Sequence, residues 1–356
     1  MTAASLWARL SAEDLVEGDL PAPEQAASPW FVRVMLGIAG WIGALFLIAF
    51  VGAAFSSIMD DAIAAASVGA ACCAGAFFLF RSFDGNDFAE QFGLVVSLVG
   101  QMLIVVGLAG YLKPEDPPLY LAVAAVEAVL ALAVPNFLHR VLATSGAAVA
   151  LALGVNQLEL HGLAAPLLSA GLAFVWLDPG RWAASGRLWR PVGYGLVLAL
   201  LLVETFRLFG AGWLLGLRGE ASGWFALYGP LLGRGVTAAI LVWTATALSL
   251  REGGGNRIST LALGVAILVA LVSLTAPGLA SALLILLLGF AAGNRILAAL
   301  GILSLLGFVA HFYYSLHATL LEKSGILALT GLSLLAAHVL LRRLSRPSAE
   351  PETGHA

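Results

Sequence analysis

Long apolar runs follow one another along almost the whole chain, separated by short polar stretches. A helix needs about 20 apolar residues to cross a bilayer, within a range of about 17 to 25. By this measure the pattern predicts about twelve membrane spans. Their expected ranges are 34–57, 62–80, 92–112, 119–135, 140–157, 161–177, 191–215, 231–250, 258–276, 278–293, 296–317 and 324–341. We therefore expect an all-α, polytopic transmembrane helical bundle.

Two parts of this assignment leave alternatives open. The runs between 119 and 177 are short and rich in Ala and Gly, so the number of spans is least certain there. The tight turn at Ala276-Pro277-Gly278 separates the ninth run from the tenth, and it is also compatible with a re-entrant hairpin.

The flanking segments are more polar than the runs. Residues 1–33 carry five acidic side chains and no apolar core before Val34, so they do not resemble a signal peptide. We expect residues 1–33 to form a cytoplasmic lead, either a short amphipathic helix near Ser5–Leu15 or a loosely held tail. Residues 34–343 then form the transmembrane domain, and residues 344–356 form a disordered cytoplasmic tail.

Composition supports a membrane protein over a soluble one. Hydrophobic residues make up 60% of the chain and charged residues only 11%, whereas soluble domains average about 25% charged residues. Lipid is therefore the expected solvent. The net charge is only −3, which gives no reason to expect nucleic acid as a partner.

The distribution of Lys and Arg predicts an orientation. With twelve spans and the N-terminus inside, 13 of the 18 basic residues fall on inner segments, four fall on outer segments, and Arg207 lies within a span. Basic residues are retained on the cytoplasmic side of bacterial membranes. The asymmetry therefore predicts that both termini are cytoplasmic. The most basic segment is the loop expected at 178–190, which holds Arg181, Arg187 and Arg190.

Four ionisable residues within the runs form the candidate polar site: Glu127, Glu204, Arg207 and His311. A charge at the centre of a span costs about 2.5–3.5 kcal/mol. At about 1.5 Å rise per residue the four lie at similar depth, toward the outer half. We expect them to face one another or a shared wet cavity. Glu204 and Arg207 are also spaced to pair directly on one helix.

The role of this polar site has two interpretations. It is either an architectural ion pair that holds the bundle together or a transport site in which Glu127 or Glu204 changes protonation. On the outer side, Tyr313, Tyr314 and Lys323 are further candidate polar residues. His311, His317 and Glu322 lie at spacings that fit no helical face, so we predict no metal site and no cofactor. No catalytic motif is present, so we do not expect an enzyme.

Two stretches near the ends of the chain are distinctive. The first is Pro29-Trp30-Phe31-Val32-Arg33 with the following Leu36–Ile42, and the second is Tyr313–Leu316 with Thr319–Gly325. These stretches resemble a bacterial membrane family known as domain of unknown function 4401. The resemblance implies an inner-membrane protein of about twelve helices, and it is compatible with a periplasmic protein partner. It implies no catalytic or binding residues.

Two functional hypotheses follow. In the first, the protein is a permease-like transporter for a small molecule of unknown identity, and the intramembrane charges are its site. In the second, it is a non-catalytic membrane subunit or scaffold for a membrane or periplasmic protein partner. The short loops, the lack of a soluble domain and the lack of a transport motif are compatible with the second.

Overall fold

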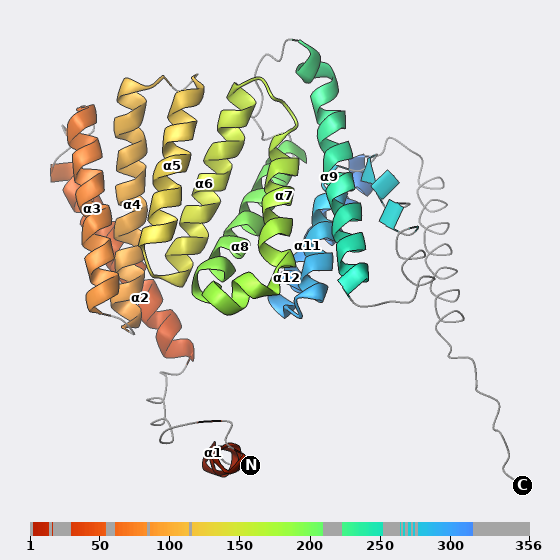
Figure 1. Cartoon of the computed structure of the whole chain (residues 1–356). Coiled ribbons are helices and arrows are strands. Elements are labelled where there is room, and N and C mark those ends of the chain that lie inside the picture. Colours follow the sequence, from red (N-terminus) through yellow and green to blue (C-terminus); the bar gives the residue numbers. More distant parts are fainter. Residues whose placement is uncertain are drawn as a thin grey trace, which may run out of the picture. The chain divides into compact units, whose positions relative to one another are not determined.

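The computed structural model describes residues 3–13, 16, 30–54, 61–83, 86–113, 116–208, 223–251, scattered positions between 264 and 274, and 277–315. All regular secondary structure in these residues is helical, which confirms the all-α prediction (Figure 1). The helices are α1 Ala3–Ala12, α2 Trp30–Ala54, α3 Ala62–Ser82, α4 Asp87–Tyr111, α5 Pro117–Ala133, α6 Phe137–Gln157, α7 Ala164–Leu177, α8 Pro179–Leu208, α9 Trp224–Arg251, α11 Leu279–Ala291 and α12 Arg295–Ser315.

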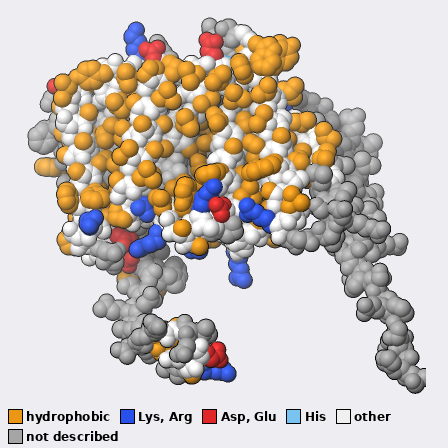
Figure 2. Space-filling view, viewed as in Figure 1, with side chains coloured by type: hydrophobic (Ala, Val, Ile, Leu, Met, Phe, Trp, Pro, Cys, Tyr) orange, Lys and Arg blue, Asp and Glu red, His pale blue; other side chains and the backbone are white. Residues whose placement is uncertain are grey.

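Several of these helices are suited to lipid. Within the described residues, six are long and apolar enough to cross a membrane, namely α3, α4, α6, α8, α9 and α12, while α5, α7 and α11 are apolar but shorter. Many large apolar side chains point outward, as Met102 at 71% exposure and Leu250 at 75% illustrate. Figure 2 shows such side chains spread over the helices, with charged groups mostly near the helix ends. The chain is thus consistent with a membrane protein. The expected run at 324–341 lies outside the described residues.

The segment 178–190 differs from its prediction as a loop, because it forms the first part of α8. Asp178 starts it by accepting a hydrogen bond from the Gly180 N–H at 2.9 Å, and its carboxylate also pairs with Arg181 at 3.3 Å. The helix breaks at Ser185, where the backbone leaves helical geometry (φ −149°, ψ 46°). The charges that suggested a loop therefore lie on a helix that packs Trp182 and Trp189 against the core.

The chain divides into two compact units. The first comprises residues 1–112 with 134–139, and the second comprises 113–133 with 140–356. In the first unit, α3 and α4 approach closely through small residues. A Cβ added at Gly100 would lie 2.7 Å from both the Gly69 carbonyl oxygen and the Cys73 sulfur. Such small-residue contacts allow close helix packing in lipid.

The second unit packs around α7 and α8. Leu172, Leu200 and Leu284, from α7, α8 and α11, are fully buried in its core. The Trp176 ring lies 4.4 Å from Trp182 and 5.6 Å from Tyr194, measured between ring centroids. This core holds α8 in place between α7 and α11, and so positions the polar residues of α8.

Arginines gather at one end of the second unit, which we call the basic end. Arg140 of α6 donates to the Arg187 carbonyl oxygen at 3.0 Å, and Arg251 of α9 donates to the carbonyl oxygen of Leu177, the last residue of α7. Because successive helices alternate in direction (Figure 1), the start of α8 and the ends of α7 and α9 meet here. The basic end consists of Arg140, Arg181, Arg187, Arg190, Arg251 and Arg295.

Candidate functional site

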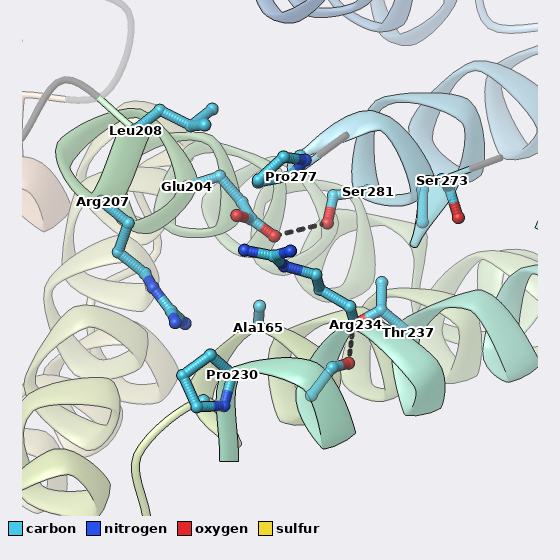
Figure 3. A pocket seen from close by; sticks show the side chains of 14 residues that line it. Ala165, Glu204, Arg207, Leu208, Pro230, Arg234, Thr237, Ser273, Pro277 and Ser281 are labelled. Carbon is cyan, nitrogen blue, oxygen red and sulfur yellow. Dashed lines mark hydrogen bonds between the residues drawn. The ribbon is translucent and has the colours of Figure 1, made fainter. Parts of the chain in front are cut away.

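A polar pocket of ≈ 320 Å³ lies in the second unit, at the end opposite the basic end (Figure 3). It is bordered by the end of α8, the part of α9 from Pro230 to Thr237, the start of α11, and the turn between α6 and α7. Its ionisable lining residues are Glu204, Arg207 and Arg234. The pocket therefore joins segments that are far apart in the sequence.

Glu204 is the carboxylate of the pocket. It lies on α8, its side chain is buried, and it accepts a hydrogen bond from the Ser281 hydroxyl of α11 at 2.8 Å. Its neighbours Leu200 and Val203 pack into the apolar core and hold this part of α8. The Ser281 bond ties α11 to α8 and directs the carboxylate toward the start of α11.

Two arginines share the pocket with this carboxylate. Arg207 lies about one turn beyond Glu204 on α8, and Arg234 lies in the third turn of α9. Both interact electrostatically with Glu204. Arg234 also donates to the Leu274 carbonyl oxygen at 3.4 Å. Figure 3 shows the Arg234 guanidinium turned toward Glu204 and that of Arg207 turned toward Pro230.

The expected direct pair between Glu204 and Arg207 does not form. The single ion pair between described residues joins Arg181 and Asp178. The reason lies in packing, since Ser281 takes up the Glu204 carboxylate while the Arg207 side chain extends away from it (Figure 3). The spacing of three residues allowed the pair but did not require it.

The start of α11 forms another wall of the pocket. Gly278 precedes the helix in the left-handed region (φ 81°), and no side chain caps the first turn. The first N–H groups of a helix have no acceptor within it, so they are available to the pocket. With 13 residues, α11 is about 20 Å long, which is short for a complete span. This agrees with the re-entrant alternative raised by the turn at 276–278.

The turn between α6 and α7 closes the pocket from the side of α9. Gly162 (φ 89°) sits directly on two α9 glycines, Gly229 and Gly233. A Cβ at Gly233 would lie 2.1 Å from the Gly162 carbonyl oxygen, and a Cβ at Gly229 would lie 2.0 Å from that of His161. Only glycine allows backbones to approach so closely. These two glycines have the same four-residue spacing as Gly289 and Gly293, of which Gly289 touches α12.

The other predicted site residues lie elsewhere. Glu127 of α5 is buried against Gly146 of α6, where an added Cβ would lie 3.4 Å from its carboxylate. His311 of α12 is half-buried, and neither residue lines the pocket. Tyr313 and Tyr314 stack edge to face at 5.5 Å, with Tyr314 exposed. Lys323, His317 and Glu322 lie outside the described residues.

Sequence reasoning missed Arg234 and Ser281 as pocket residues. Arg234 looked like an outer flanking charge, because it lies near the start of its apolar run. One signal in the sequence could have found it. Arg234 directly follows Gly233 of the Gly229/Gly233 pair, and such a pair marks the side of a helix that contacts another backbone. Ser281 had no signal beyond its position four residues after Pro277.

A second buried polar cluster lies in the first unit. The His139 Nε2 atom lies 2.8 Å from the Ser97 hydroxyl oxygen and 3.1 Å from the Gln101 side-chain nitrogen. All three residues are buried. Gln101 lies within the run expected at 92–112, whereas His139 directly precedes the run expected at 140–157. Among the described residues, no group of three His, Cys, Asp or Glu side chains is arranged to hold a metal ion.

The side chains that line the pocket are of kinds that can bind an anionic group and can take up or release a proton. Two guanidinium groups donate hydrogen bonds in a planar geometry that suits carboxylate and phosphate. A buried carboxylate that faces a cavity can take up and release a proton. The pocket contains both kinds of group.

Comparison with known proteins gives one match. No curated protein and no solved structure matches the chain. The model of one protein family matches residues 29–344, nearly the whole chain. On this match, and in agreement with its two distinctive terminal stretches, the chain belongs to the family described as domain of unknown function (DUF4401).

Proposed function

We propose that the protein is a multi-span transporter of the bacterial inner membrane, and that the pocket formed by Glu204, Arg207 and Arg234 is its solute site. One observation carries this proposal: three ionisable side chains from two helices line a cavity of ≈ 320 Å³ inside an apolar helical unit. Charges within a membrane bundle usually mark a path for solutes or ions. The role is transport without covalent chemistry and without a cofactor.

The short helix α11 supports this role. Secondary transporters often bind solutes where a helix is interrupted inside the bundle, so that free backbone groups face the site. Here α11 begins at the pocket behind Pro277 and Gly278. The interruption provides polar backbone groups without placing them in lipid.

Glu204 is the group that we expect to couple transport to protons. Ser281 binds its carboxylate, and both arginines act on it electrostatically. Arrival or departure of a charged solute changes this electrostatic environment, so the proton affinity of Glu204 changes with occupancy. Proton binding and solute binding are thereby linked.

The proposal includes an orientation. We propose about twelve spans with both termini in the cytoplasm, because the basic end of the second unit then faces the cytoplasm as the positive-inside rule expects. The pocket, at the opposite end, then lies toward the periplasm. A solute enters it from that side in the proposed transport cycle.

Solute profiling of cells tests the proposal. A strain lacking the gene receives the wild-type gene, the Glu204→Gln variant or the Glu159→Gln variant, and solutes in cells and medium are measured by mass spectrometry. Glu159 is an exposed carboxylate in the turn after α6 and serves as the matched control. We expect wild type and Glu159→Gln to change the cell-to-medium ratio of the same solute, and Glu204→Gln to leave it at the level of the deletion strain. Equal profiles for Glu204→Gln and wild type, at equal membrane levels, would refute the transport role.

The alternative role is that of a non-catalytic subunit or scaffold for a membrane or periplasmic protein. It predicts that a partner co-purifies in stoichiometric amounts from native membranes in mild detergent, and that Glu204→Gln leaves both complex and phenotype intact. Copurification of such a partner together with unchanged solute profiles would favour this alternative over transport.

A further inference from the structure

The charges of the pocket do not balance. Two guanidinium groups, of Arg207 and Arg234, line the pocket together with one carboxylate, of Glu204. The Glu204 carboxylate accepts a hydrogen bond from Ser281, and Arg234 donates to the neutral carbonyl oxygen of Leu274. Among the described residues neither arginine forms an ion pair. Counted over the described residues that line it, the pocket therefore holds one positive charge in excess.

The start of α11 increases this excess. The N-terminal end of a helix carries about half a positive charge, and no side-chain cap offsets it at Gly278. Excess charge inside a membrane bundle is costly unless a counter-charge accompanies it. A bound anion provides this counter-charge, together with acceptors for the arginine and backbone N–H groups.

We infer that the solute of this pocket carries an oxyanion group, a carboxylate or a phosphate, which binds between the guanidinium groups of Arg207 and Arg234. This inference rests on the proposed function and specifies the class of its substrate. Glu204 lies on the same wall and repels a second negative group, so the site favours solutes with a single anionic centre.

The size of the pocket limits the solute. Small-molecule sites in proteins span about 300–1,000 Å³, and ≈ 320 Å³ lies at the lower end of this range. Small organic acids and small phosphate esters fit within such a volume.

Thiol labelling measures the charge of the pocket without knowledge of the solute. In full-length protein in detergent, with Cys72 and Cys73 replaced by Ala, Ser281→Cys places a thiol on the pocket wall. Its labelling rate is measured with an anionic and with a cationic methanethiosulfonate reagent of similar size. The same thiolate attacks the sulfur of both reagents and displaces methanesulfinate, so the ratio of the two rates cancels any change in thiolate fraction and reports the local potential.

The reference position is Ser11→Cys on exposed α1, which has both Arg9 and Glu13 within two residues. Relative to this reference, we expect the pocket thiol to prefer the anionic reagent by about tenfold, as one uncompensated charge a few ångströms away in a wet site produces. Arg207→Gln combined with Arg234→Gln should abolish the preference. Arg295→Gln, which removes an exposed charge at the basic end, should leave it unchanged.

Each outcome decides the inference. A preference for the cationic reagent, or none, would overturn the anion assignment and leave transport through the pocket standing. No reaction with either reagent would overturn both, since a solute site must admit molecules of this size. If Ser281→Cys does not fold, Ser273→Cys on the same pocket replaces it. Slower labelling in the presence of acetate or inorganic phosphate, compared with chloride at equal ionic strength, would identify the preferred oxyanion.

Discussion

Replacement of Gly233 by Ala tests the close contact that closes the pocket. The added Cβ would lie 2.1 Å from the Gly162 carbonyl oxygen, which is 1.3 Å short of the 3.4 Å at which ordinary contacts begin. The obstacle is backbone, so no side-chain rotation relieves it. The turn between α6 and α7 must therefore move away from α9, and the pocket loses one of its walls.

The expected cost follows from two opposing effects. Ala is favoured over Gly in a helix by about 1 kcal/mol, whereas overpacking costs about 1–3 kcal/mol and more when backbone must shift. We expect Gly233→Ala to destabilise the protein by about 2 kcal/mol. At about 2–4 °C per kcal/mol for a unit of this size, the melting temperature should fall by about 4–8 °C.

The control lies two residues further along the same helix. A Cβ at Gly235 would meet nothing within 4 Å, so Gly235→Ala retains only the favourable helix term and should leave the melting temperature equal or slightly higher. The assay is thermal unfolding of purified protein in one detergent, followed by intrinsic fluorescence. Equal melting temperatures for the two variants would refute the contact between Gly162 and α9, and with it the proposed closure of the pocket.

Three further predictions follow from the same structure. Ser281→Ala removes the hydrogen bond to Glu204 and should lower stability by about 1.5–3 kcal/mol, the usual range for a bond to a charged group; an unchanged melting curve would show that the bond does not form. Gly193→Ala places a Cβ 2.6 Å from the Trp176 indole nitrogen, and the displaced ring should alter tryptophan fluorescence, so an identical spectrum would contradict this packing. Ser185→Cys in an otherwise cysteine-free chain should resist impermeant thiol reagents added to intact spheroplasts and react in inverted vesicles; labelling in spheroplasts would refute the proposed orientation.

Linear sequence was sufficient for several features of this protein. The lengths of the apolar runs predicted several helices closely, as α3 and α12 illustrate at Ala62–Ser82 and Arg295–Ser315 against runs at 62–80 and 296–317, whereas α9 (Trp224–Arg251) begins seven residues before its run at 231–250. Backbone hydrogen bonding in a low-polarity environment forces such runs into helices whatever they pack against. Sequence also singled out Glu204 and Arg207, because a charge within an apolar run is unusual wherever the helix lies.

Only the tertiary structure shows which way each polar side chain points around its helix. Glu127, Glu204 and His311 are at similar predicted depth, since depth depends only on the number of residues from the helix end. Yet of these only Glu204 lines the pocket, because the neighbours that each side chain meets depend on how the helices rotate and pack. The partner of Glu204 is Ser281, 77 residues away in sequence, and no local pattern links the two.

The basic segment 178–190 likewise has features that the sequence predicts and features that only the tertiary structure shows. Its charges correctly marked one end of the helical unit, where Arg187 meets Arg140, but they also suggested a loop. Trp182, before the break at Ser185, and Trp189, after it, both pack on the core and favour helix on either side of the break. Sequence thus determined the helices, their apolar character and the segments rich in charge. Tertiary packing decided which polar groups meet, because small residues such as Gly162 and Gly233 allow particular backbones to touch and so set the position of every side chain around them.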